Sequence, residues 1–172
     1  MPIPSWRTRV AAAAFLLAAC AGAQAADAPK GPKPSVTLLT PIGYADDATA
    51  KPAVREHCEL ETAVQTNVLE ALSTDGREVQ QVASKDSGEV LAVSIQRVQG
   101  LGAWAGPKTL SLMAHVYKDG KSVHLKMFSD RSNGVPLQGT CSILQGISKT
   151  LSKQLVKWLD EMDAAAAPQP AQ

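Results

Sequence analysis

Two histidines have a spacing in this chain that could support metal chemistry. His115 and His124 flank Asp119-Gly120, and apolar residues alternate on both sides of this dipeptide. Asp-Gly between alternating segments predicts a β-hairpin, here over residues 108–130, with a two-residue turn. In a regular register the two histidines are direct cross-strand neighbours with Cβ atoms about 4.5–5.5 Å apart, so they could share a transition metal or repel each other when protonated. The alternative is two half-exposed histidines without a ligand, because no third ligand is evident.

The same register divides the hairpin into two faces, because side chains alternate along a strand. Val116 would face Val123, and Ala114 would face Leu125, which places these apolar side chains together on the buried side. Phe128 would then belong to the other, more polar face with the histidines. The pattern therefore predicts that the apolar residues of the second strand point into the core.

Two cysteines, Cys58 and Cys141, are expected to form a disulfide, because the chain carries an export signal and exported proteins mature in an oxidising compartment. The bond would close a loop of about 80 residues and stabilise the fold by roughly 4 kcal/mol. The close Cys-x-x-Cys spacing of redox-active pairs is absent. A free reactive thiol or a metal ligand is the alternative.

Residues 1–25 have the features of a signal peptide. Two arginines precede an apolar run over residues 10–19 that is too short to span a bilayer. Cleavage before Ala26 would follow the small-x-small rule and release a free chain. The stretch Leu-Ala-Ala-Cys that ends at Cys20 also resembles a bacterial lipobox, in which Cys20 would be lipidated and would anchor the protein. Both alternatives predict export to the periplasm, the second as an outer-membrane lipoprotein.

Composition narrows the classes of function. The chain has 172 residues with 17 basic and 16 acidic side chains, and loss of the signal peptide removes two arginines, leaving 15 basic against 16 acidic. A surface so close to neutral offers no electrostatic basis for binding nucleic acid. Aromatic residues make up 4% of the chain, which argues against stacking platforms for bases. The remaining residues, about 147, suffice for one domain with its own core.

Two segments have the apolar spacing of amphipathic helices. The first runs from Pro52 to about Leu72, and the second from Thr140 to Met162 with Thr140 or Ser142 as its N-cap. The disulfide would join the starts of the two helices, so we expect them to be neighbours with their N-termini at the same end. The apolar stripes are Leu60, Val64, Val68, Ala71 and Leu72 in the first helix, and Leu144, Ile147, Leu151, Leu155 and Trp158 in the second.

Two further features could form a contact surface. Lys149, Lys153 and Lys157 line one face of the second helix at a spacing of four, as in a face that meets anionic lipid or a partner, although such a stripe is also typical of a solvated face. Trp104 lies in a glycine-rich connector, where it is either a plug over the core or an exposed contact residue.

The remaining segments predict the fold class. Strands are expected over residues 36–40, 78–83 and 89–99, and a loop over residues 44–51. With the hairpin, the order is β-α-β-β-β-β-α. This order predicts an α+β fold: a two-layer domain with a mostly antiparallel sheet of 4–5 strands and two helices on one face.

Two segments without regular structure are expected to flank this domain. Residues 26–34 form a flexible proline-rich leader, and the single α+β domain spans residues 35–163. Residues 164–172 are rich in alanine, proline and glutamine and predict a disordered tail.

A set of residues in the second half of the chain matches a known pattern: Trp104, Gly106, Lys108, Gly139, Cys141, Leu155, Trp158 and Leu159. On these residues the chain resembles a group of small secreted bacterial proteins of unknown function. The resemblance covers Cys58 to Leu159, and its motifs are structural. More remotely, the order of elements is similar to that of accessory α+β domains of envelope lipoproteins that serve in secretion or assembly, which implies an accessory role.

Together these features predict a non-enzymatic envelope protein that binds or helps to assemble a protein partner. No nucleophile with a base and an orienting acid is organised in the sequence, so no catalytic residue and no cofactor is expected. The alternatives are a small metal-binding protein that uses His115 and His124, and an unrecognised hydrolase. A membrane contact is expected only through a lipid anchor at Cys20.

Overall fold

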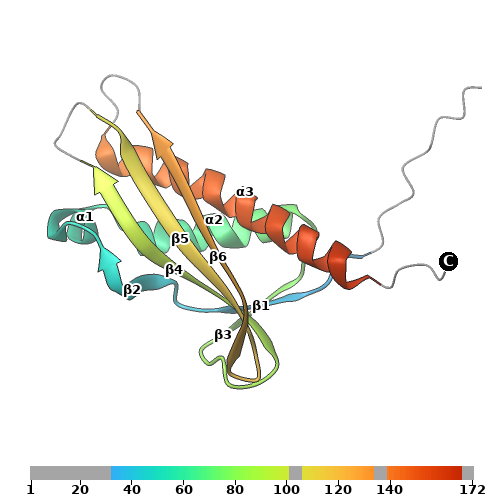
Figure 1. Cartoon of the computed structure of the whole chain (residues 1–172). Helices are drawn as coiled ribbons and strands as arrows, with labels where there is room; N and C mark the ends of the chain where they lie inside the picture. The colour runs from blue at the N-terminus through green and yellow to red at the C-terminus, as the bar shows by residue number, and fades with distance from the viewer. Residues whose placement is uncertain (1–31, 101–105, 134–138, 168–172) are drawn as a thin grey trace, which may run out of the picture. The chain divides into compact units, whose positions relative to one another are not determined.

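The computed structural model describes residues 32–100, 106–133 and 139–167, and its elements belong to one compact unit, residues 31–172. The fold is α+β, as the sequence predicts, and its long strands and helices are shown in Figure 1. The strands are β1 (Val36–Leu39), β2 (Gly43–Thr49), β3 (Val79–Val82), β4 (Glu89–Gly100), β5 (Lys108–Lys118) and β6 (Lys121–Ser132). The helices are α1 (Pro52–His57), α2 (Leu60–Thr74) and α3 (Thr140–Ala166).

Within the described residues, the strands form one mixed sheet of six strands rather than the expected four or five. The order is β3-β1-β4-β5-β6, and β2 pairs with β4. The three longest strands, β4 to β6, are antiparallel as predicted, whereas β1 and β2 pair with β4 in parallel and β1 pairs with β3 in parallel. The parallel part follows from the α1–α2 segment, because a helical crossover returns the chain in the same direction.

The expected loop over residues 44–51 is wrong, because strand β2 occupies most of it. β2 pairs with β4 at Gly43 and Tyr44 and again at Thr49, with an irregular register between them. Its sequence, Gly-Tyr-Ala-Asp-Asp-Ala-Thr, lacks alternating apolar residues. A short strand that carries acidic side chains gives no periodic signal from which it could be predicted.

The β5–β6 hairpin is present, but the predicted register is wrong beyond the turn. Asp119 and Gly120 both have positive φ, 49° and 75°, as a type I′ turn requires. A β-bulge between Val116 and Tyr117 then shifts the pairing, so that Val116 lies opposite His124 and not opposite Val123. Because side chains alternate, this shift of one residue exchanges the buried and exposed faces of β6.

The helix expected from Pro52 to Leu72 is divided in two. α1 ends at His57, and α2 begins at Leu60 after Glu59, whose φ of 45° lies in the left-handed region. Such a residue cannot continue a right-handed helix. The predicted stripe is nevertheless correct for Leu60, Val64, Val68 and Leu72, which are buried.

Helix α3 begins where the sequence predicts, but with a different cap. Gly139 is the N-cap residue and makes no side-chain hydrogen bond, so neither Thr140 nor Ser142 holds that position. The helix continues to Ala166, which corrects the expectation that the disordered tail starts at residue 164. All five residues of the predicted apolar stripe are buried: Leu144, Ile147, Leu151, Leu155 and Trp158.

A disulfide joins Cys58 and Cys141, with 4.9 Å between their Cα atoms. It links Cys58, which follows α1 and lies two residues before the start of α2, to the first turn of α3. The two helices α2 and α3 run side by side in the same direction (Figure 1). Gln145 donates a hydrogen bond to the carbonyl of Cys58 at 3.3 Å, and Asn67 contacts the Ser148 hydroxyl at 2.5 Å. The core lies between these helices and the sheet and includes Leu38, Val64, Ile95, Leu112 and Leu151.

Candidate functional site

The face of the β5–β6 hairpin that points away from the helices carries an exposed apolar row. In the described residues, the large hydrophobic side chains that are exposed are Val123 at 48%, Leu125 at 58% and Met127 at 55%. All three belong to β6. Scattered single apolar residues are normal on a surface, but a group on one strand is typical of an interaction site.

The bulge is the local cause of this exposure. It places His115 opposite Leu125, and Met113 opposite Met127, on the outer face of the sheet. Phe128 points to the helices instead, where it is 5% exposed and packs edge-to-face on Trp158, with ring centroids 5.9 Å apart. We define the outer row as Met113, Val123, Leu125 and Met127.

Polar and aromatic groups border the outer row. The His115 ring stacks on Tyr117 with centroids 5.6 Å apart, and its Nδ1 lies 3.3 Å from the Ser122 hydroxyl. Lys85 places its ammonium 4.4 Å from the Tyr117 ring centroid. An apolar centre with a polar rim is the usual composition of a protein interface.

A hollow of 470 Å³ opens beside the outer row, between β2 and the outer face of β4 and β5. Asp46 and Asp47 line one side, and Met113 and His115 line the other. Gln96 donates a hydrogen bond to Asp47 at 3.0 Å, which holds β2 against the sheet. The hollow therefore continues the exposed surface of the outer row towards the acidic side chains Asp46 and Asp47 of β2.

Tyr44 also borders this hollow, and its hydroxyl is buried without a hydrogen-bond partner in the part of the chain that the structure describes. Burial raises the pKa of Tyr44, and the nearby Glu61 carboxylate raises it further, while Arg55 lowers it. The Arg55 guanidinium lies 4.3 Å from the ring centroid. The phenol therefore stays protonated at neutral pH.

The predicted metal pair is not formed. His115 lies opposite Leu125 on the outer face, and His124 lies opposite Val116, so the two imidazoles are not cross-strand neighbours. Among the described residues, no group of three or more His, Cys, Asp and Glu side chains could hold a metal ion. The cross-strand register from which the histidine metal site was predicted is therefore wrong.

The three lysines of the predicted stripe on α3 have different environments in the structure. Lys149 pairs with Glu70 of α2 at 3.5 Å, and Lys149 and Lys153 line a hollow of 390 Å³ between α2 and α3. Lys157 is exposed.

Trp104 and Cys20, the other candidates for contact and lipidation, lie outside the described residues.

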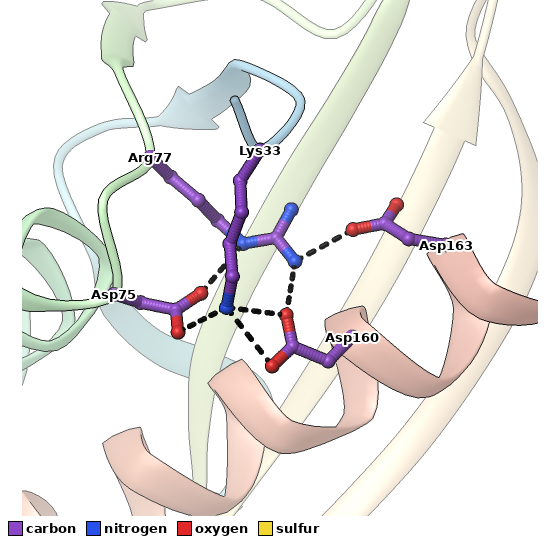
Figure 2. A network of polar contacts seen from close by, with 5 residues as sticks. All are labelled: Lys33, Asp75, Arg77, Asp160 and Asp163. Carbon is purple, nitrogen blue, oxygen red and sulfur yellow. Dashed lines mark hydrogen bonds and ion pairs between the residues drawn. The ribbon is translucent and has the colours of Figure 1, made fainter. Parts of the chain in front are cut away.

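A second cluster, which the sequence does not reveal, joins the ends of α2 and α3 (Figure 2). We call it the Arg77 network: Lys33, Asp75, Arg77, Asp160 and Asp163. Arg77 has a side chain only 2% exposed and donates to Asp75 at 3.0 Å, to Asp160 at 2.7 Å and to Asp163 at 2.6 Å. Lys33 donates to Asp75 and to Asp160, the latter at 2.9 Å.

The charges of the Arg77 network explain its pKa shifts. The hydrogen bond from Lys33 lowers the pKa of Asp160; burial opposes this, and the hydrogen bond from Arg77 lowers the pKa further. The bonds to Asp75 and Asp160 raise the pKa of Lys33. Burial lowers the pKa of Arg77, but its bonds to the three carboxylates raise it overall. Each carboxylate already accepts a hydrogen bond, so the network is suited to fastening segments together and not to proton transfer.

The Arg77 network could not be found by sequence reasoning, because its hydrogen-bonded residues are separated by up to 127 positions and share no motif. It fastens the described end of the leader to the end of α3. The outer row, in contrast, forms an apolar pattern that is visible in the sequence, but a regular hairpin register places it on the wrong face.

Comparisons with known proteins give a fold likeness. No family model and no curated protein sequence matches this chain. The solved structure of protein XCC0632 from Xanthomonas campestris, of family DUF330, is 14% identical, with a TM-score of 0.53 that covers 76% of this chain and 87% of that one. At this identity the match shows a shared fold alone.

Two bacterial lipoproteins are weaker structural matches. The minor lipoprotein from Acinetobacter baumannii is 9% identical over 77% of this chain and 93% of that one, with a TM-score of 0.40. Lipoprotein GNA1162 from Neisseria meningitidis is 13% identical over 73% and 99%, with a TM-score of 0.39. The match to XCC0632 confirms, at the level of the fold alone, the expected likeness to bacterial proteins of unknown function.

Within the described ranges, no helix is both long and apolar enough to cross a membrane.

Proposed function

We propose that this protein is an exported cell-envelope protein that binds a protein partner through the outer row and works as a non-enzymatic binding or assembly domain. The observation that carries this proposal is the exposure of Val123, Leu125 and Met127, at 48%, 58% and 55%, on one strand of the sheet. Keeping such side chains in water is unfavourable, by about 25 cal/mol for each Å² of apolar surface, so a partner that covers them gains free energy.

The chemistry of the surface favours a protein as the partner. Methionine side chains are flexible and polarisable and are enriched in interfaces between proteins. Met113 and Met127 lie opposite each other in the row, and His115 and the hydroxyl pair Ser111 and Ser129, 2.9 Å apart, border it. This mixture suits a partner that offers an apolar centre and hydrogen-bonding groups at its rim.

The location rests on residues 1–25 and on the disulfide, which is typical of proteins outside the cytoplasm. The intact mass of the native protein, taken from soluble and membrane fractions without reduction, tests it. We expect a chain that starts at Ala26 or at an acylated Cys20. Its mass should be lower than that of the reduced chain by two hydrogen atoms, because Cys58 and Cys141 form a disulfide. A chain that retains residues 1–25 and both thiols would contradict export.

The binding role can be tested on the size of the native complex. Extracts of the cell envelope would be separated by size under mild detergent, and the protein would be located with an antibody. We expect it to elute as a complex larger than its own dimer, and we expect the variant Leu125→Asp/Met127→Asp to lose that complex. The matched control, Thr66→Asp on the exposed face of α2, should retain it. A wild-type protein that elutes no larger than its own dimer would contradict the proposed function.

A further inference from the structure

Strand β6 is an edge strand of the sheet. It has twelve residues, and among the described residues only β5 pairs with it. Edge strands of this length are normally shortened, covered or interrupted, because their free backbone groups pair readily with another strand. The bulge distorts β6 near Val123, so the regular part of the edge runs from His124 to Ser132.

We propose that two copies of this chain form a symmetric dimer by antiparallel pairing of β6 with β6, with the two-fold axis at Phe128. In this register the whole regular segment is paired, since residues 124 and 132 lie at equal distances from residue 128. Lys126 lies opposite Asp130 of the partner subunit, and Asp130 lies opposite Lys126 of the partner subunit. Opposite charges directly across two strands stabilise the pairing.

Neighbouring registers are less favourable. A two-fold axis at Lys126 places two lysines opposite each other, and like charges in that position are destabilising. An axis at Leu125 draws the bulged residue Val123 into the new ladder, where its irregular backbone disturbs the hydrogen bonds. An axis at Met127 places Lys126 opposite Phe128 and leaves its charge without an opposite charge across the ladder. Of these registers, the one centred on Phe128 both places opposite charges across the ladder and leaves the bulged residue Val123 outside it.

The charged pair is accessible for this purpose. The Lys126 side chain is 43% exposed, and its contact with Glu161 of α3, at 3.7 Å, is long and solvated. Asp130 accepts a hydrogen bond from the backbone of Arg131 at 2.8 Å through one oxygen atom, Oδ1. The Lys126 ammonium also lies 5.7 Å from the Phe128 ring centroid. Both residues can therefore meet a partner without breaking a buried ion pair.

Helix α3 leaves room for the second copy. It packs on both β5 and β6, so part of it lies beside the edge where the second copy would pair. The side of α3 towards the β6 edge carries the small residues Gly146 and Thr150, which line a hollow with Asp130 and Arg131.

The dimer goes beyond the proposed function and does not depend on it. It uses the edge of β6, whereas the proposed partner uses the outer face. Pairing would bring the outer rows of the two copies side by side on one face of a continuous sheet.

Two single variants with opposite defects test the dimer. Sedimentation equilibrium would be measured on the purified protein carrying Cys20→Ser, so that no lipid is attached, and on the same protein with Lys126→Glu or Asp130→Lys. Each variant alone places like charges across the two-fold axis, so we expect its dimerisation to be at least about tenfold weaker. In an equimolar mixture, the Lys126→Glu site of one chain would face the Asp130→Lys site of the other. Opposite charges would then meet again at both ends of the pairing.

The mixture separates loss of pairing from loss of folding. We expect the wild-type chain to be dimeric, each variant to be monomeric with an unchanged circular dichroism spectrum, and the mixture to recover a heterodimer. A monomeric wild type, variants that dimerise as tightly as the wild type, or a mixture that stays monomeric would each overturn the proposal. The outer-row variant Leu125→Asp/Met127→Asp should lose the partner complex whatever the result, so failure of the dimer and failure of the proposed function are distinguishable.

Discussion

His115 lies directly opposite Leu125 across β5 and β6, on the face of the sheet that points away from the helices. This pairing is a consequence of the bulge beside Val116, which shifts β6 by one residue. It separates the two histidines and turns Leu125 and Met127 outward while Phe128 points inward. The surface character of the hairpin therefore depends on one extra residue in β6.

The relation between Phe128 and Leu125 gives a direct test of the register. Phe128 is 5% exposed against Trp158, so Phe128→Ala should reduce the free energy of unfolding by about 3 kcal/mol. Leu125 is 58% exposed, so Leu125→Ala should change it by less than about 0.5 kcal/mol. Urea unfolding followed by tryptophan fluorescence, at a protein concentration that keeps the chain monomeric, measures both. A larger loss for Leu125→Ala would show that the register without the bulge is correct.

The hairpin shows what sequence reasoning can and cannot provide. Asp119-Gly120 determines the turn because both residues must adopt positive φ, and this local requirement is visible in the residue types. The bulge has no such marker. It accompanies the packing of Phe128 against Trp158, a contact between residues far apart in the chain. The turn is predictable, and the face of each side chain beyond it is not.

Removal of Arg77 should be costly, because its buried guanidinium is shared by three carboxylates. We expect Arg77→Met to reduce the free energy of unfolding by about 2–4 kcal/mol, since Asp75, Asp160 and Asp163 would be left without their common partner. Urea titration at neutral pH and low salt measures this change.

The matched control for Arg77 is Lys149, whose pair with Glu70 is exposed on both sides, at 57% and 56%. Lys149→Met should cost less than about 0.5 kcal/mol, because exposed ion pairs contribute little. Equal effects of the two substitutions would show that the Arg77 network has no special structural role.

Asp160 should give stability a specific dependence on pH. Its pKa is lowered in the folded protein, chiefly by the hydrogen bond from Lys33, relative to an unfolded value of about 3.9. The folded state therefore binds the proton more weakly, so the stability from Asp160 is present above about pH 4 and is lost as the pH falls through the lower, folded pKa.

We accordingly expect Asp160→Asn to be less stable than the wild type at neutral pH, and the difference to shrink below about pH 4. Urea midpoints measured from about pH 7 to about pH 2 would show the two curves converging, because the range spans the unfolded pKa of about 3.9. A constant difference over this range would contradict the contribution of the Asp160 carboxylate.

The disulfide should contribute mainly through the length of the loop that it closes. Cys58 and Cys141 are 83 positions apart, and the double variant Cys58→Ser/Cys141→Ser should be less stable by about 4 kcal/mol on the chain-entropy model. Urea unfolding of the variant against the oxidised wild type measures it. A loss below about 1 kcal/mol would indicate that contacts such as that of Gln145 with Cys58 already hold the helix starts together.

In the helices and the sheet, too, features set by nearby residues are predictable from the sequence, and features set by residues distant in the chain are not. The stripes of α2 and α3 are predictable because burial at helical spacing is a local pattern. The break at Glu59 is not, because a charged residue with left-handed φ has no sequence signal. Sequence reasoning misses strand β2 and Arg77 for a related reason: each takes its role from elements remote in the chain, β4 for the strand and α3 for the arginine.

The central claim, that the outer row contacts a protein partner, is tested most directly by cross-linking in living cells. A photo-activated amino acid would replace Leu125 in one variant and Thr66, on the exposed face of α2, in the other. We predict that the probe at Leu125 forms an adduct with a different envelope protein, identified by mass spectrometry, and that the probe at Thr66 does not. An adduct at Leu125 with a second copy of this chain alone, or the same adducts at both positions, would contradict the claim.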